Sequence, residues 1–437
     1  MSDIILVHPD YPWPLKYPPM GVAYLAAYLE KMGGYSVRII DLAIEPMSLD
    51  ELTDRIGEDI AQIAGISFMT CQAQEAYDIS DAIKGKLPWV HTVGGGIHAT
   101  TLPEEARPHF DFLVMGEGEK PLLELSDALI KEDIPEPEIR GVFGKPENGA
   151  AKYKRRFLED LNALPFPAWD LLHLDRYKGL GKGLEGEDPF MVILGSRGCP
   201  NHCVFCASHI VHGKKFRCRS PQSIVDELTA FKSEYGIGQF DFADDTMTVF
   251  EDRILELCSL IRKKQLDIRW DCNARVNTVN MKMLRAMKAA GCVRINFGVE
   301  SGDPEILKRA KKGFTIDQIK KAHQMARDAG LRIMSFFMLG LPGETAETIE
   351  RTLDLFHALP TDYPGLTLAT PYPGTPLFDL AKEKGWIDDR TWNRYTTTIA
   401  GEHFSPVMRT DGLDRDQLLD KYREVLEYFR ERESESL

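Results

Sequence analysis

Short apolar runs alternate with amphipathic segments through the first third of the chain. The runs are rich in β-branched residues, as is typical of strands buried on both faces of a parallel sheet. They are DIILVH (3–8), SVRII (36–40), IAGISF (63–68), WVHTV (89–93) and DFLVM (111–115). The segments between the first four, such as LDELTDRIGEDI and AQEAYDISDAIKGK, place apolar residues at helical spacing. This alternation predicts a doubly wound α/β domain over residues 1–135, with a ligand crevice at the carboxyl ends of its strands.

A stretch without clear periodicity follows, over residues 136–188. It carries KPENGAAKYKRR and LPFPAWD, and its proline, glycine and charge content indicates a surface linker. A second alternating series then begins. Its apolar runs are MVILGS (191–196), QFDFAD (239–244), IRWDCNA (268–274), VRINFGV (293–299), RIMSFFML (332–339) and GLTLAT (365–370).

Helix-start signals separate these later runs. Ser220 before Pro221 and Asp303 before Pro304 are typical of helix N-caps, and TIDQ from Thr315 fits a capping box. Six β/α units predict a partial (β/α)6 barrel of the triosephosphate-isomerase type over residues 189–385, with its chemistry at the carboxyl ends of the strands. The first domain is predicted to be flavodoxin-like (Rossmann-like), and residues 386–437 a small helical C-terminal region.

Composition narrows the class of protein. The 437 residues carry a net charge of -14, which disfavours bulk nucleic acid as the partner because phosphate binding needs a basic face. No apolar run approaches the roughly 18 residues of a transmembrane helix, and the first residues do not resemble a signal peptide. We therefore expect a cytoplasmic protein, in which closely spaced cysteines bind metal more often than they form disulfides.

Three cysteines lie directly after the first barrel strand, in GSRGCPNHCVFCASH. Cys199, Cys203 and Cys206 have the spacing C-x3-C-x2-C. A structural zinc site needs four ligands, so three thiolates are one short. A 4Fe-4S cluster can be held by three cysteines, with one iron left open for chemistry. Zinc completed by Cys218, His202 or His209 remains the alternative.

This spacing, with Phe205 before the last cysteine and a barrel around it, resembles the radical S-adenosylmethionine superfamily. The resemblance implies that the three cysteines are catalytic metal ligands, and that the open iron chelates the amino and carboxylate groups of S-adenosylmethionine. It also implies reductive cleavage to methionine and a 5'-deoxyadenosyl radical. The electron would come from a donor such as flavodoxin or ferredoxin.

Other strand ends of the barrel carry polar residues that fit the same resemblance. Asp244 and Asp245 follow the second strand, Arg275 the third and Glu300 the fourth. Similar proteins use such groups to bind S-adenosylmethionine, although each could instead form an ion pair or a helix cap. Tyr372, after the sixth strand, is a candidate to face the substrate.

The strand ends of the first domain are rich in glycine. SFMT, VGGGIHATTLPEE and MGEGEKPLLEL follow its third, fourth and fifth strands, and together they resemble a cobalamin-binding domain. Of the pattern D-x-H-x-x-G, S-x-L and GG, the second and third parts are matched, whereas the first is replaced by PPMGVAYL. The resemblance therefore implies that cobalamin binds without a histidine of that motif beneath its cobalt. The turn from Thr70 to Gln72 is one candidate to lie there instead. The residues expected to bind this cofactor are Pro19, Gly21, Ser67, Met69, Thr70, Gly94, Gly95, His98, Gly116, Glu117 and Gly118.

The order of the parts resembles the cobalamin-binding radical S-adenosylmethionine enzymes. It implies hydrogen abstraction from a small-molecule, lipid or peptide substrate, followed by methyl transfer from methylcobalamin to an unactivated carbon. The alternative is radical ring formation or rearrangement without methyl transfer, as in the anaerobic cyclase of bacteriochlorophyll synthesis. A sensor without catalysis fits the three cysteines less well. Methylthiotransferases carry further cysteines in their front domain, whereas here only Cys71 precedes residue 199.

Overall fold

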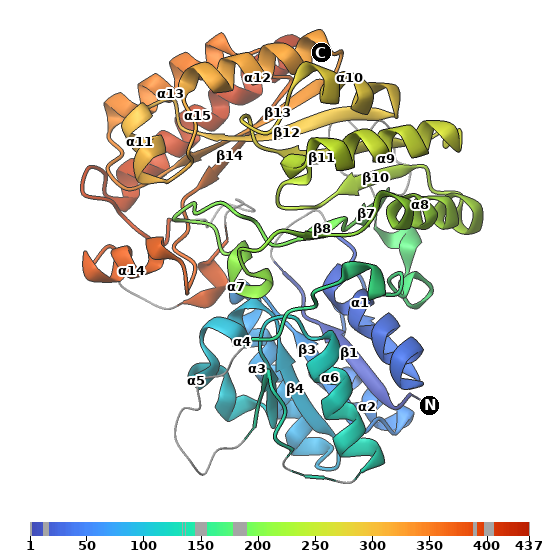
Figure 1. The fold of residues 1–437 in the computed structure, drawn as a ribbon. Coiled ribbons are helices and arrows are strands. Elements are labelled where there is room, and N and C mark those ends of the chain that lie inside the picture. The colour runs from blue at the N-terminus through green and yellow to red at the C-terminus, as the bar shows by residue number, and fades with distance from the viewer. Residues whose placement is uncertain are drawn as a thin grey trace. The chain divides into compact units, whose positions relative to one another are not determined.

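The computed structural model describes residues 2–11, 17–132, 134–135, 137–144, 155–177, 190–387, 391–396 and 406–436. The chain forms two compact units (Figure 1). The first comprises residues 1–177, 207–213 and 391–393, and the second comprises residues 178–206, 214–390 and 394–437. Within the described ranges, no helix is both long and apolar enough to cross a membrane.

The first unit is built on a sheet in the order β2-β1-β3-β4-β5-β6. All pairings from β2 to β5 are parallel, so the flavodoxin-like strand order is confirmed, with its switch point between β1 and β3. The five predicted strands are present as β1 (Ile4–His8), β2 (Val37–Asp41), β3 (Ile63–Ser67), β4 (His91–Gly95) and β5 (Phe112–Val114). Strand β6 (Val142–Phe143) pairs antiparallel with β5 and lies in the stretch interpreted as a linker.

Helices α1 (Met20–Tyr28) and α6 (Glu119–Ser126) pack against one face of this sheet. Their apolar side chains join those of β1, β3 and β4 in one buried cluster, because successive strand residues alternate between the two faces. Helices α2 (Leu49–Asp59) and α3 (Ala73–Lys86) contact each other. The short helices α4 (Ile97–Thr101) and α5 (Pro103–Ala106) follow β4, and α7 (Ser208–His212) belongs to this unit.

The second unit is an open, all-parallel sheet in the order β14-β13-β12-β11-β10-β7, which confirms the partial barrel. Its strands are β7 (Phe190–Ile193), β10 (Gln239–Phe242), β11 (Arg269–Ala274), β12 (Cys292–Glu300), β13 (Arg332–Leu339) and β14 (Tyr363–Leu368). A two-stranded ribbon, β8 (Ser196–Arg197) with β9 (Arg217–Cys218), follows β7. The crossover helices lie outside the sheet (Figure 1); they are α8 (Pro221–Tyr235), α9 (Glu251–Lys263), α10 (Met281–Ala289), α11 (Pro304–Arg309), α12 (Ile316–Asp328) and α13 (Ala346–Ala358).

The predicted helix caps are confirmed. The Ser220 hydroxyl accepts a hydrogen bond from the backbone N–H of Ser223, and Thr315 forms a complete capping box with Gln318. The Asp303 carboxylate accepts from the N–H groups of Glu305 and Ile306 and caps α11. These caps satisfy N–H groups that have no partner within the helix, so they fix where each helix begins after its strand.

The C-terminal region, residues 386–437, contains the long helix α15 (Arg415–Ser436), as predicted. Helix α14 (Pro376–Glu383) precedes this region and lies within the segment predicted as barrel. The Tyr422 hydroxyl donates to the carbonyl of Leu366 on β14 at 3.2 Å, and the ring of Phe429 packs 5.4 Å from that of Phe337 on β13. Helix α15 is thus part of the second unit's packing. The boundaries of the four predicted segments stay predictions, and residues 136, 145–154 and 178–188 of the linker lie outside the described residues.

One buried carboxyl group makes the stability of the second unit depend on pH. Glu344 lies in the loop between β13 and α13, fully buried, and burial raises its pKa to about 8 from an ordinary value of 4.5. Between these two values the folded chain holds a proton that the unfolded chain releases. The free energy of unfolding therefore falls as pH rises through this window. Glu344→Gln keeps an oxygen to accept from the N–H of Gly340 but cannot ionise.

We expect urea unfolding of the wild type to lose more stability between about pH 5 and about pH 8 than that of Glu344→Gln. The variant Glu347→Gln, at an exposed neighbouring carboxylate, is the matched control and should keep the wild-type pH dependence in this window. Parallel stability curves for the wild type and Glu344→Gln would contradict this account of Glu344.

Candidate active site at the ends of the strands

The three cysteines lie on the loop at the carboxyl end of β7. Gly198, at φ +82°, turns the backbone just before Cys199. Cys199, Cys203 and Cys206 are each partly exposed. The side chain of Asn201 donates to the Cys199 sulfur at 3.2 Å, and the backbone N–H of Cys206 donates to the carbonyl of Cys203 at 3.3 Å. The loop is thus held by its own polar groups while its thiols stay accessible.

The donor set suits an iron–sulfur cluster better than zinc. Among the described residues, no three His, Cys, Asp or Glu side chains converge on a point where they could share one metal ion. A zinc site needs such convergence, with four ligands around a single ion. Three cysteines that hold a 4Fe-4S cluster each bind a different iron, so their sulfurs need not converge. The loop therefore fits the cluster, and zinc completed by Cys218, His202 or His209 finds no support in this geometry.

Asp244 supports this loop from behind. Its carboxylate is buried and accepts from the backbone N–H of Gly195 at 2.9 Å and from the hydroxyl of Ser196. Burial raises its pKa, although nearby Arg253 and these hydrogen bonds oppose the shift. Asp244 is therefore placed to fix the turn that leads to Cys199. Asp245 beside it is exposed. Contact of either carboxylate with S-adenosylmethionine stays a prediction.

Arg275 and Glu300 are joined through a residue that the sequence analysis missed. The guanidinium of Arg275 lies 3.6 Å from the Cys203 sulfur and also donates to the carbonyl of Lys312. The Lys312 ammonium forms a buried ion pair with Glu300 at 2.9 Å. A polar chain thus runs from Cys203 to the end of β12. In the sequence Lys312 is one of two adjacent lysines before Gly313, and this pair has no periodic pattern that would predict a buried side chain.

Glu300 has a strained backbone. Its φ is +67°, and the register between β12 and β13 shifts at this point. A left-handed conformation costs energy for a residue other than glycine, and such strain gathers at functional sites. A side chain at Gly298 would place its Cβ 2.6 Å from Oε1 of Glu300, so only glycine leaves room for the ion pair. Strand and side chain are both arranged around this carboxylate.

Strand register places a second polar cluster on one face of the barrel sheet. Asp241 pairs in register with Asp271, and Asp271 with Arg294. Arg294 donates to the buried carboxylate of Asp271. Desolvation, with the nearby charge of Asp271, raises the pKa of Asp241 well above its ordinary value. From the sequence these strands are predicted to be apolar, because each of these three charged residues stands alone between uncharged neighbours.

Tyr372 lies in the loop after β14 and is half-buried. Its carbonyl accepts from the hydroxyl of Thr375 at 2.6 Å, which turns the chain into α14. This hydrogen bond within the loop therefore accounts for the turn between Tyr372 and α14. That its ring faces substrate stays a prediction.

The first unit offers bare backbone at its strand ends. A Cβ placed on Gly95, at the end of β4, would meet nothing closer than 3.8 Å, and one placed on Gly21 would meet nothing within 4 Å. The N–H of Gly116 donates to the hydroxyl of Thr100 at 3.0 Å, which ties the loop after β5 to the helix after β4. Open glycines at the switch-point edge fit a large ligand that approaches the backbone closely, as cobalamin would.

The other residues expected around cobalamin occupy several kinds of position. Ser67 ends β3, Gly94 is buried within β4, and Met69 and Thr70 begin the turn Thr70–Gln72. Pro19 and Gly118 precede the first residues of α1 and α6. All but Gly94 lie at or next to element ends, although Pro19 and Thr70 are buried there, and their contact with cobalamin stays a prediction.

His98 and Glu117 are used within the first unit. His98 is fully buried; its Nε2 lies 3.0 Å from the Tyr77 hydroxyl, and burial lowers its pKa to about 4, so it is neutral at pH 7. Glu117 is buried and accepts from the backbone N–H of Leu158 at 2.7 Å, with His212 on α7 at 3.0 Å. Both residues organise loops at the strand ends, and their roles toward the cofactor stay predictions.

Comparison with known proteins finds a matching family for each of the two units. A family model for the radical SAM superfamily matches residues 193–356, and one for the B12 binding domain matches residues 13–126. An uncharacterized methyltransferase of Pyrococcus horikoshii is 36% identical over 408 residues, covering 92% of this chain and 85% of that protein.

Two further proteins extend the comparison. The anaerobic magnesium-protoporphyrin IX monomethyl ester cyclase of Rubrivivax gelatinosus is 29% identical over 433 residues, covering 96% of this chain and 75% of its own. The solved structure of the radical S-adenosylmethionine methyltransferase TsrM from Kitasatospora setae, with cobalamin and a 4Fe-4S cluster bound, superposes with a TM-score of 0.71 at 23% identity. It covers 88% of this chain and 78% of that one. At this identity the likeness to TsrM is one of fold.

Asp244 and Asp245 allow a matched test of loop support. Asp244→Ala removes the acceptor of the Gly195 N–H and leaves a buried donor unpaired, which costs about 1–3 kcal/mol. We expect it to bind less iron per chain after anaerobic reconstitution, whereas the exposed Asp245→Ala should keep the wild-type content. Equal loss of iron in both variants would contradict the supporting role of Asp244.

The Glu300–Lys312 pair predicts strong coupling. Removing one partner leaves the other as an unpaired buried charge. Glu300→Gln and Lys312→Met should therefore each lower the free energy of unfolding by about 3 kcal/mol. The double variant should lose clearly less than the sum of the two, as measured by anaerobic urea unfolding. Additive losses would show that the two charges do not depend on each other.

Proposed function

Since this chain belongs to the cobalamin-binding radical S-adenosylmethionine enzymes, we propose that it methylates an unactivated carbon of its substrate. The observation that carries the proposal is the coexistence of two sites in one chain. A loop of three accessible thiols follows the first barrel strand, and the first unit leaves the backbone open at Gly21 and Gly95, as the approach of a large ligand requires. That the Pyrococcus relative is a methyltransferase by name favours this outcome.

Cys199, Cys203 and Cys206 would hold the 4Fe-4S cluster. With S-adenosylmethionine bound, this cluster supplies one-electron reductive cleavage of the sulfonium. The chain's part is to bind and orient. Arg275 donates toward the Cys203 sulfur, and hydrogen bonds to such sulfurs tune a cluster's potential. The cations of Arg275 and Lys312 and the carboxylate of Glu300 complement the carboxylate and ammonium of an amino acid, as the methionine part of S-adenosylmethionine requires.

Cobalamin would lie against the strand ends of the first unit, where it supplies methyl donation to carbon. Ser67, Gly95 and the turn from Thr70 to Gln72 are the chain's own contributions. The Gln72 amide is already bonded at both ends, to the backbone N–H of Met69 and to the carbonyl of Pro9. Thr70, which is buried, and Cys71, which is partly exposed, are therefore the remaining candidates in this turn to face cobalt, and the site would lack a histidine ligand from the usual motif.

We propose a small-molecule, lipid or peptide substrate and a cytoplasmic site of action. Partly exposed thiols that bind a cluster require a reducing compartment. The electron would come from a protein donor such as flavodoxin or ferredoxin, since the reaction consumes one electron for each S-adenosylmethionine that is cleaved.

A second candidate function is radical ring formation without methyl transfer. It is favoured by the Rubrivivax cyclase, which aligns with nearly the whole chain. The two functions share the cluster and differ in what happens to the methyl group of S-adenosylmethionine. Methyl transfer through cobalamin converts one S-adenosylmethionine to S-adenosylhomocysteine, whereas ring formation does not.

The test needs no substrate. We expect the reconstituted protein, given methyl-labelled S-adenosylmethionine, cobalamin and dithionite, to form 5'-deoxyadenosine and S-adenosylhomocysteine and to carry label into the cobalamin fraction. 5'-Deoxyadenosine without label in that fraction would contradict the methyltransferase and favour the cyclase.

Cysteine variants test the cluster in the same assay. Cys203→Ala should abolish formation of 5'-deoxyadenosine and still bind cobalamin, because the two cofactors use different units. Cys218→Ala is the matched control, since Cys218 lies on β9 outside the three-cysteine loop. Loss of metal in Cys218→Ala would instead support zinc completed by that residue.

A further inference from the structure

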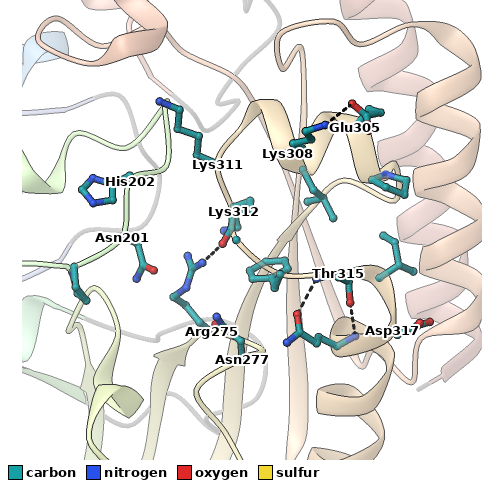
Figure 2. Close-up of a pocket in the computed structure, with 17 residues that line it drawn as sticks. Asn201, His202, Arg275, Asn277, Glu305, Lys308, Lys311, Lys312, Thr315 and Asp317 are labelled. Atoms are coloured by element: carbon teal, nitrogen blue, oxygen red, sulfur yellow. Dashed lines mark hydrogen bonds and ion pairs between the residues drawn. The ribbon is translucent and has the colours of Figure 1, made fainter.

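The second unit has a pocket of about 940 Å³ beside the cysteine loop (Figure 2). One wall is the segment 200–202, which lies between Cys199 and Cys203. The other wall is the end of α11 and the loop into α12. Figure 2 shows Asn201, His202 and Lys311 on one side, and the paired Lys308 and Glu305 on the other. Its floor includes Arg275 and Lys312, which the proposed reaction uses, whereas the proposed reaction gives no role to the lysines at its rim, Lys308 and Lys311.

Its rim is cationic in a chain that is acidic overall. Between Pro304 and Lys321 the sequence has six lysine or arginine residues and two acidic residues, against a net charge of -14 for the whole chain. The Lys308 side chain is 77% exposed and lies 3.7 Å from Glu305. Lys311 is exposed and has a φ of +54°, a strained conformation that is unusual for lysine. Both lysines line the pocket, so they place solvated positive charge at its rim.

The floor of the pocket reaches the cluster ligands directly. Asn201 and Arg275 line it, and these two side chains donate to the sulfurs of Cys199 and Cys203 at 3.2 Å and 3.6 Å. One side chain therefore separates the pocket surface from two of the three thiolates. An electron that arrives at this surface would therefore have one layer of side chains to cross before it reaches the ligands of the cluster.

The pocket is poorly built for a small anion. Such ligands are usually held by buried polar groups that converge on them. Here the buried cations of the floor pair within the chain, Lys312 with Glu300 and Arg275 with the Lys312 carbonyl, and the proposed function already assigns them to S-adenosylmethionine, so they offer no site for a further anion. The cations that remain are exposed lysines at the rim. Exposed lysines attract an oppositely charged surface over a distance and speed its encounter, and they contribute less to tight binding.

We propose that this face is the docking surface for a small, acidic one-electron carrier protein of the flavodoxin or ferredoxin type. The rim lysines, Lys308 and Lys311, steer the carrier, and the floor passes one electron to the cluster. The carrier's cofactor is oxidised by one electron and the cluster is reduced by one; no bond breaks and no proton moves. The inference rests on the cluster assigned to the three cysteines and does not depend on methyl transfer.

The test follows reduction of the cluster. The reconstituted full chain, without substrate, is mixed anaerobically with fully reduced flavodoxin, and the loss of cluster absorbance is timed by stopped flow. We expect Lys308→Glu/Lys311→Glu to lower the second-order rate at low ionic strength by about tenfold or more, with the difference shrinking as salt is added. Lys311→Gln alone should show a smaller effect of the same kind.

Arg262→Glu/Lys263→Glu is the matched control, because it makes the same charge change at exposed positions at the end of α9 and outside the pocket. Dithionite should reduce the cluster at the same rate in every variant, and the affinity for oxidised flavodoxin should fall only in the pocket variants. Equal rates with flavodoxin in pocket and control variants would overturn the proposal. So would an equal slowing with dithionite, which would mean that the lysines act on the cluster itself.

Discussion

The second unit depends on one buried polar chain, from the Cys203 sulfur through Arg275 and Lys312 to Glu300. The Arg275 guanidinium donates to the Cys203 sulfur and to the Lys312 carbonyl. The Lys312 ammonium forms an ion pair with the buried carboxylate of Glu300. Burying these charges would be costly without such pairing. The strained backbone of Glu300 and the bare Gly298 are tolerated because they allow this arrangement. The chain thereby sets the distance between the cysteine loop and the end of β12.

Parallel sheets explain why the remaining groups gather where they do. In both units the chemistry-bearing residues follow the carboxyl ends of strands, since every crossover returns the chain to the same edge. The first unit leaves glycines open at this edge, which suits a large flat ligand. The second unit fills the edge with a thiol loop and supports it with the buried carboxylate of Asp244. Two α/β folds with one architectural rule thus provide two different cofactor sites.

Short local patterns in the sequence predict much of the fold and of the cysteine loop. The strands, the caps at Ser220, Thr315 and Asp303, and the cysteine loop are written in short stretches of sequence, and the structure has them. The missed features depend on residues that are distant in sequence. Asp271 meets Arg294 only through strand register, and Lys312 meets Glu300 only once α11 has folded back over the end of β12. Periodicity cannot report such pairs, because each partner alone looks like a surface charge.

The two cofactor sites, a 4Fe-4S cluster on three cysteines and cobalamin on the first unit, can both be counted per chain. Purification without oxygen, followed by measurement of iron, sulfide, zinc and extractable cobalamin, does so in one experiment. We expect about four irons and four sulfides per chain, no stoichiometric zinc, and cobalamin bound on purification or taken up when added. Zinc in place of iron, or iron with no uptake of cobalamin, would contradict this expectation.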